Sequence, residues 1–119
     1  MDLKLEERHV GRVTVIDIGG RLTIDHGADR LKDKVNSLIS QGRTQLVLNL
    51  SNVPYIDSGG LGQLVASYGS VKKAGGSLKL LNVSSRNHDL LSITRLVTVF
   101  DTFDTEAEAV ASFQPLAVD

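Results

Sequence analysis

The sequence contains no cysteine and no tryptophan, and it has only three Phe, two Tyr and two Pro among 119 residues. Without cysteine the chain forms no disulfide, offers no thiolate to a metal and has no thiol nucleophile, which fits a reducing cytoplasm. Charge of one sign is not in excess either, because 13 basic and 14 acidic side chains leave a formal net charge of -1. The lack of a basic stripe and of stacking aromatic rings argues against nucleic-acid binding as the main function.

Long apolar runs are also absent. No stretch approaches the roughly 20 residues of a membrane-spanning helix, and the N-terminal MDLKLEERHV is too charged for a secretory signal. We therefore expect a cytoplasmic protein without membrane insertion. The 41% of hydrophobic and 23% of charged residues are typical of a globular domain. This length suffices for one hydrophobic core, so we expect a single domain over residues 1–119 with a tail that frays from about residue 114.

Short runs rich in β-branched and apolar residues alternate with stretches whose apolar residues recur at helical spacing. The runs predict strands at 13–18, 46–50, 78–83 and 99–103, with residues 3–8 as an edge strand or hairpin partner of the first. Helices are predicted from Gly27 to Gly42, from Ser58 to Ala74, from Ser84 or Ser85 through Ile93, and from Thr105 to Pro115. This alternation predicts an α/β fold, with a mixed, mostly parallel β-sheet of four to five strands and about four helices.

The apolar face of each helix predicts which side chains reach the core. In the second helix this face comprises Leu61, Leu64, Val65, Tyr68 and Val71. Polar residues off that stripe, namely Gln63, Ser67 and Ser70, are expected to face solvent. The third helix carries the apolar residues Leu90, Leu91 and Ile93. The last helix opens with a capping box at residues 105–108 and is expected to bury Val110 and Phe113.

The second helix begins with an unusual group, Asp57-Ser58-Gly59-Gly60. Asp57 or Ser58 is suited to cap the helix, which is worth about 1 kcal/mol. Two glycines in a first turn weaken the helix and indicate that another backbone or a bulky group approaches closely. Ser58 is also suited to accept a phosphoryl group, which adds about -1.5 to -2 charges at the positive end of the helix.

The sequence offers little support for an enzyme or a metal-binding protein. The region around Ser58 lacks the G-x-S-x-G pattern, and the three histidines (His9, His26, His88) stand in no motif, so no catalytic residues are predicted. The stretch Gly60-Leu61-Gly62 is an incomplete dinucleotide fingerprint, and a phosphate-binding lysine is missing. Asp101, Asp104 and Glu108 are more simply explained as caps and dipole partners. We predict no metal and no cofactor, with weak nucleotide binding at the Ser58 turn as a remaining alternative.

The segment LVLNLSNVPYIDSGGLGQLVASYGSVKKAGGSLKLLNV closely resembles the central part of STAS-domain anti-sigma factor antagonists, which act in bacterial stress and developmental signalling. The family pattern is an apolar strand, Asp-Ser-Ser/Thr-Gly-Leu-Gly, a helix, Gly-Gly and a further strand. The matching residues are Asp57, Ser58, Gly60, Leu61, Gly62, Gly75 and Gly76. The resemblance extends from about Val13 to Phe113.

The resemblance implies a binding module rather than an enzyme. Ser58 stands where the family has its usual phospho-acceptor. Unphosphorylated members bind an anti-sigma factor that is also a serine kinase, a histidine-kinase-like ATPase, and thereby free a sigma factor. Phosphorylation breaks that complex, and a PP2C-type phosphatase restores it. A monomer or weak dimer is expected.

Two departures from the family pattern concern the site. Gly59 replaces the common second Ser or Thr, which leaves Ser58 as the hydroxyl to be modified. The family often has Gly-Glu-Leu-Asp after the second strand, where this chain has Gly20-Arg21-Leu22-Thr23. The partner-binding residues implied are Thr23, Asp25, Asp57, Ser58, Gly59, Gly60, Gly62, Gln63 and Ser67. The alternative is an unphosphorylated STAS adaptor or scaffold subunit of a signalling complex or transporter, in which Ser58 serves the helix alone.

Overall fold

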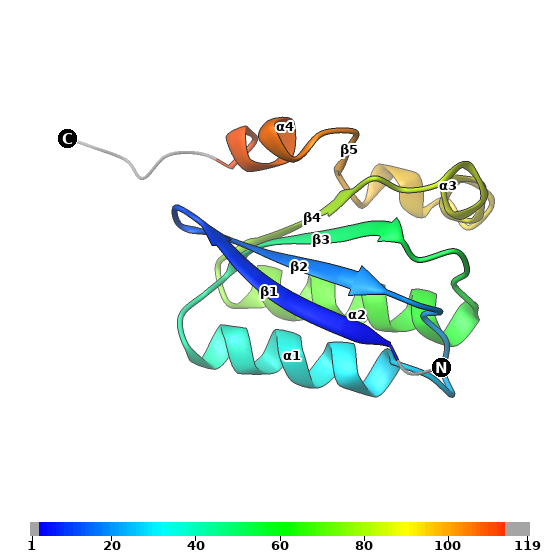
Figure 1. The fold of residues 1–119 in the computed structure, drawn as a ribbon, viewed down its shortest axis with the longest axis horizontal. Coiled ribbons are helices and arrows are strands. Elements are labelled where there is room, and N and C mark those ends of the chain that lie inside the picture. Colours follow the sequence, from blue (N-terminus) through cyan, green and yellow to red (C-terminus); the bar gives the residue numbers. More distant parts are fainter. Residues whose placement is uncertain (1–2, 114–119) are drawn as a thin grey trace.

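A five-stranded sheet in the order β1-β2-β3-β4-β5 forms the frame of the protein in the computed structural model, which describes residues 3–113 (Figure 1). Its strands are Lys4–Val10 (β1), Val13–Gly19 (β2), Gln45–Asn52 (β3), Ser77–Leu81 (β4) and Thr102–Phe103 (β5). β1 and β2 form an antiparallel hairpin, and the other neighbours pair in parallel. The predicted mixed, mostly parallel sheet is therefore confirmed.

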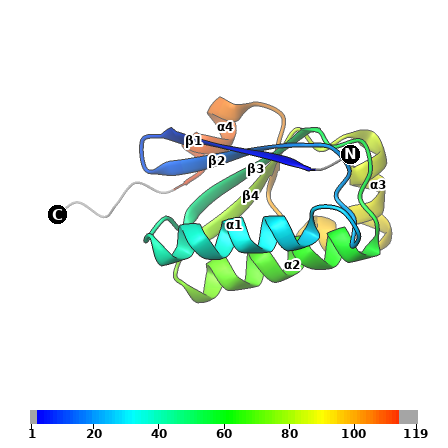
Figure 2. The same ribbon diagram turned by 60° about the horizontal axis from the view of Figure 1, so that its bottom comes forward.

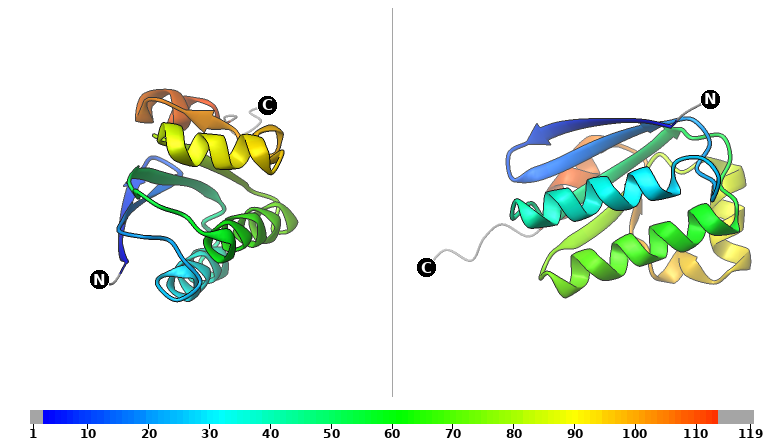
Figure 3. Two further views of the ribbon diagram at one scale, coloured as in Figure 1. Left: turned by 90° about the vertical axis from the view of Figure 1, so that its right-hand side faces the viewer. Right: turned by 90° about the horizontal axis from the view of Figure 1, so that it is seen from below.

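Within residues 3–113, four α-helices lie on the two faces of this sheet. They are Ala28–Ser40 (α1), Ser58–Lys73 (α2), Ser85–Ile93 (α3) and Glu106–Ala111 (α4), with a 3-10 turn at Leu96–Thr98 between α3 and β5. α1 and α2 lie side by side across one face (Figure 2), and α3 and α4 lie on the other (Figure 3). The central strands β2 and β3 consist mostly of buried apolar residues, as expected of strands that are covered on both faces.

Several sequence-based details need correction. The predicted strand at 99–103 is shorter, because the Val99 and Phe100 amides donate hydrogen bonds to the Leu96 carbonyl of the preceding 3-10 turn. β5 pairs with β4 through Thr102 and Phe103 only. β4 ends before Val83, since Asn82 adopts a positive φ of 58° that a strand does not accommodate. The last helix ends at Ala111, so Phe113 lies beyond it. Ala109 is fully buried, whereas Val110 and Phe113 are only partly buried. The predicted frayed tail and Pro115 lie outside the described residues.

The buried face of α2 is rotated relative to the prediction. Its buried residues are Gly60, Leu61, Leu64, Ser67 and Val71. They are spaced three or four positions apart after Leu61, so they lie on one side of the helix. Val65 falls outside this face and is 37% exposed, so its predicted burial is wrong. Ser67 falls inside the face and is 2% exposed, so its predicted exposure is also wrong. The Gln63 side-chain amide donates a hydrogen bond to the Ser67 hydroxyl at 2.9 Å, which satisfies the buried oxygen.

Not all apolar residues of α3 reach the core. Asn87 and Leu91, four residues apart, form the buried side of this helix. Ile93 lies two positions further along, on the opposite side, and is 80% exposed. The Asn87 side chain donates a hydrogen bond to the Val53 carbonyl at 3.0 Å, which holds α3 against the loop before α2.

An ion-pair cluster joins α4 to the hairpin. The Arg8 guanidinium on β1 lies 2.5 Å from the Asp17 carboxylate on β2 and 2.6 Å from the Glu106 carboxylate on α4. Its hydrogen bonds hold the pKa of both carboxyl groups below their ordinary values, and Asn49 adds a further hydrogen bond to Asp17. The cluster thus gives the small helix a charged attachment besides its apolar contacts.

Acid is expected to weaken this attachment. The carboxylates stabilise the fold fully above their unfolded-state pKa values near 4, and this contribution is lost as the pH falls through their lower folded-state values. Because the groups are partly exposed, the contribution is at most about 1 kcal/mol. Urea unfolding of wild type and Arg8→Gln at pH 7 and pH 3 should show a gap in the free energy of unfolding at pH 7 that narrows at pH 3. An equal gap at both pH values would contradict the expectation.

Candidate functional site

Asp57 is the N-cap of α2. Its backbone is extended, and its carboxylate accepts a hydrogen bond from the Gly60 amide at 2.7 Å. Ser58 is the first residue inside the helix, and its side chain is exposed. Of the two capping alternatives, the structure thus selects Asp57. This leaves the Ser58 hydroxyl at the surface, free of the capping role.

Asp57 also holds the loop formed by residues 20–27, which connects β2 to α1. Its carboxylate accepts a hydrogen bond from the Ile24 amide at 3.2 Å, and its own amide donates to the Leu22 carbonyl at 3.2 Å. The Leu22 amide in turn donates to the Tyr55 carbonyl at 3.0 Å. One aspartate therefore joins the loop 20–27 to the start of α2, so the two segments form a single surface.

The paired glycines are explained by this loop. A Cβ on Gly60 would lie 2.1 Å from the Leu22 carbonyl oxygen, and one on Gly59 would lie 2.4 Å from the Ile24 Cβ. The expected close approach of another backbone is present, and that backbone belongs to the same chain. A Cβ on Gly62 would meet no atom of residues 3–113 within 4 Å, so no packing contact within the described residues requires a glycine there.

The implied partner-binding residues divide by exposure. Thr23, Gly60 and Ser67 are buried, so they support the surface residues and do not contact a partner themselves. Thr23 is 5% exposed, and its hydroxyl accepts a hydrogen bond from the His26 amide at 3.1 Å, which fixes the loop 20–27. The remaining residues reach the surface fully or in part, namely Asp25, Asp57, Ser58, Gly59, Gly62 and Gln63.

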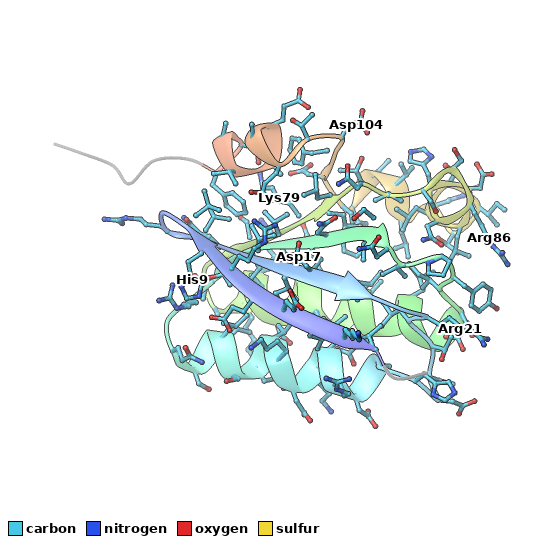
Figure 4. The ribbon with its side chains drawn as sticks, viewed as in Figure 1. His9, Asp17, Arg21, Lys79, Arg86 and Asp104 are labelled. Atoms are coloured by element: carbon cyan, nitrogen blue, oxygen red, sulfur yellow. The ribbon has the colours of Figure 1, made fainter. Side chains whose placement is uncertain are left out.

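A cleft of about 430 Å³, which no sequence pattern indicated, lies between the start of α2 and α3. Its lining residues are Tyr55, Ile56, Asp57, Ser58, Arg86, Asn87, Asp89, Leu90 and Ile93. The Arg86 guanidinium lies 4.8 Å from the centre of the Tyr55 ring, and the Arg21 guanidinium lies 5.6 Å from the same centre. Figure 4 shows both arginines at this end of the molecule. No sequence motif connects α3 to Ser58, and only the fold brings them together.

Other kinds of site find little support in the described part of the chain. Within residues 3–113, no three His, Cys, Asp or Glu side chains are grouped closely enough to hold a metal ion. Over the same range, no helix combines the length and the apolar character needed to cross a bilayer.

Comparisons with known proteins agree with this geometry. The STAS domain family model matches residues 4–109. The chain is 38% identical over 101 residues to the anti-sigma-B factor antagonist of Bacillus subtilis, which covers 85% of this chain and 87% of that protein. It is 26% identical over 115 residues to the anti-sigma F factor antagonist of Paenibacillus polymyxa, which covers 96% and 97% of the two chains.

A solved structure agrees with the fold as well. The crystal structure of a Thermotoga maritima protein assigned as an anti-sigma factor antagonist has a TM-score of 0.84 to this protein at 28% identity. The superposition covers 90% of this chain and 92% of that one. The chain belongs to the STAS domain family and, within it, to the anti-sigma factor antagonists.

Proposed function

We propose that this protein binds an anti-sigma factor when Ser58 is unmodified and releases it when Ser58 is phosphorylated. The observation that carries the proposal is the position of the Ser58 side chain, exposed at the first residue of α2 and outside the capping interaction. Asp57 holds the adjoining loop and helix in place, so a partner meets a preformed surface. The names of the relatives from Bacillus and Paenibacillus support the choice of partner.

The modification is a phosphoryl transfer from ATP bound to the partner kinase. The Ser58 hydroxyl oxygen bonds to the γ-phosphorus while the bond to the β–γ bridging oxygen breaks. The hydroxyl proton goes to a base on the kinase, and ADP leaves. A PP2C-type phosphatase reverses the modification by hydrolysing the ester to serine and inorganic phosphate. Each cycle places and removes about -1.5 to -2 charges at one point of the surface.

The docking surface consists of the loop 20–27 and the exposed side of the first turns of α2. Ile24 projects from this loop beside Gly59 and is 67% exposed, which makes it an apolar anchor for the partner. Asp25 and Gly62 lie on the same surface and are exposed. An anionic phosphoserine in the middle of a contact that excludes water is unfavourable, and this is the physical basis of release.

Ser58→Ala is expected to bind the anti-sigma factor like wild type and to stay bound in the presence of ATP. Ser58→Asp is expected to bind about 10-fold more weakly, because a carboxylate must then be desolvated in the contact. Calorimetry with the kinase encoded nearest to this gene measures both affinities. Ser37→Asp, an exposed position on α1 outside this docking surface, is the control for an added carboxylate and should leave the affinity unchanged.

Intact-mass analysis after incubation with that kinase and ATP tests the modification itself. Wild type should gain one phosphate, and Ser58→Ala should gain none. An unmodified wild-type protein would rule out the phospho-switch. Recovery of the protein with a transporter or scaffold in place of a kinase would then favour the adaptor function.

A further inference from the structure

Two guanidinium groups share one aromatic ring near Ser58. Arg86, from the first turn of α3, and Arg21, from the loop 20–27, both lie within 6 Å of the centre of the Tyr55 ring. Neither arginine takes part in an ion pair with any residue in the 3–113 range. Stacking on a tyrosine holds a guanidinium in place and leaves its N–H donors available. The two arginines therefore form a positive site that makes no ion pair within the described residues.

Arg86 and Ser58 line the same cleft from opposite helices. Two carboxylates line it as well, those of Asp57 and Asp89. The Asp57 carboxylate already accepts hydrogen bonds from the Gly60 and Ile24 amides, so it is directed toward its own turn. Ile56 and Leu90 add apolar walls to the cleft.

We propose that this cleft is an internal receptor for the phosphoryl group of phosphorylated Ser58, with Arg86 as its ligand. Arg21 does not line the cleft but contacts the same Tyr55 ring, so it adds a second positive charge nearby. The inference rests on the proposed phosphorylation of Ser58 and adds how the modified form is held. A guanidinium donates two parallel hydrogen bonds to phosphate oxygens, which a single ammonium group does not. The phosphoserine is then folded toward α3, and the switch includes an ordered phosphorylated state in addition to simple repulsion of the partner.

The test uses full-length protein with phosphoserine encoded at position 58 by stop-codon suppression, so that no kinase is needed. Phosphorus NMR over a pH series measures the second pKa of the phosphoserine, which is ordinarily about 6. A nearby guanidinium favours the dianion and lowers this pKa. Arg86→Gln is therefore expected to raise it by about 0.5 unit relative to the otherwise unchanged protein. The neighbouring carboxylates are the same in both proteins, so the difference reports Arg86 alone.

Two further variants separate this role from a general charge effect. Arg86→Lys keeps the charge and loses the fork, so its phosphoserine pKa should lie between the other two values. Arg12→Gln removes the same charge from the β1–β2 turn, at the far end of the sheet, and should leave the pKa unchanged (Figure 1). Arg86 is exposed at the start of a helix, so these replacements keep the fold, which circular dichroism verifies.

An unchanged phosphoserine pKa in Arg86→Gln would overturn the receptor. So would a loss of kinase binding by unphosphorylated Arg86→Gln, because the arginine would then belong to the docking surface. Failure of the kinase to modify wild-type Ser58 is a separate result. It would contradict the proposed function, whereas the encoded phosphoserine reports on the cleft in either case.

Discussion

Gly60→Ala is expected to lower the free energy of unfolding by about 3 kcal/mol, the upper part of the usual range for overpacking. The added Cβ would lie 2.1 Å from the Leu22 carbonyl oxygen, which is backbone and cannot move aside as a side-chain tip does. That carbonyl also accepts the Asp57 amide, so displacing it disturbs the cap and the loop 20–27 together. For a domain of this size, the melting temperature should fall by roughly 10 °C.

Gly62→Ala is the matched control, because it is the same change two residues later in the same helix. Its Cβ would meet no described atom within 4 Å, so helix propensity decides the outcome and should raise the free energy of unfolding by up to about 1 kcal/mol. Urea unfolding followed by circular dichroism measures both variants. Equal stabilities for the two variants would show that the loop 20–27 shifts to accommodate the methyl group added at position 60. The packing argument would then be wrong.

The same pair separates two reasons for a glycine in this motif. Gly60 is buried against its own chain, whereas Gly62 is exposed on the proposed docking surface. If Gly62→Ala is more stable than wild type yet binds the anti-sigma factor more weakly, the partner approaches the helix closely at this point. A stable variant with unchanged affinity would place the contact elsewhere on α2.

The sheet could be predicted from the sequence because its signals are local. β2 and β3 are runs of buried β-branched and apolar residues, and the glycines and proline that flank them mark their ends. The rotation of α2 could not be predicted in the same way. Apolar spacing favours Val65 for the core, but helix packing buries Ser67, whose hydroxyl finds a partner in Gln63.

The sequence was sufficient to predict a site at the Ser58 turn, but not to predict which of Asp57 and Ser58 caps α2. Asp57 and Ser58 are equally good caps by residue type. The choice depends on the loop 20–27, whose Ile24 amide needs the Asp57 carboxylate, and that loop is distant in sequence. Arg86 was missed for a similar reason. It lies on α3, which follows β4 in the chain, and only the folded sheet brings the start of α3 next to Ser58.

Asp57→Ala is expected to lower the free energy of unfolding by about 2 kcal/mol. About 1 kcal/mol comes from the lost cap at Gly60, and the rest comes from the Ile24 amide, which loses its acceptor. The loop 20–27 should then loosen, so hydrogen exchange at the Ile24 amide should become faster than in wild type. Calorimetry should also show weaker anti-sigma factor binding, because the partner must order the loop again when it docks.

Asp57→Asn separates geometry from charge in this cap. The asparagine oxygen accepts a hydrogen bond as aspartate does, so the loss of stability should stay below about 1 kcal/mol. Only the charge at the positive end of α2 is removed, and salt should weaken that contribution. Slow exchange at Ile24 in Asp57→Asn and fast exchange in Asp57→Ala would assign the order of the loop 20–27 to the hydrogen bonds of Asp57. Fast exchange in both variants would assign it to the charge, and the docking surface would then depend on ionic strength.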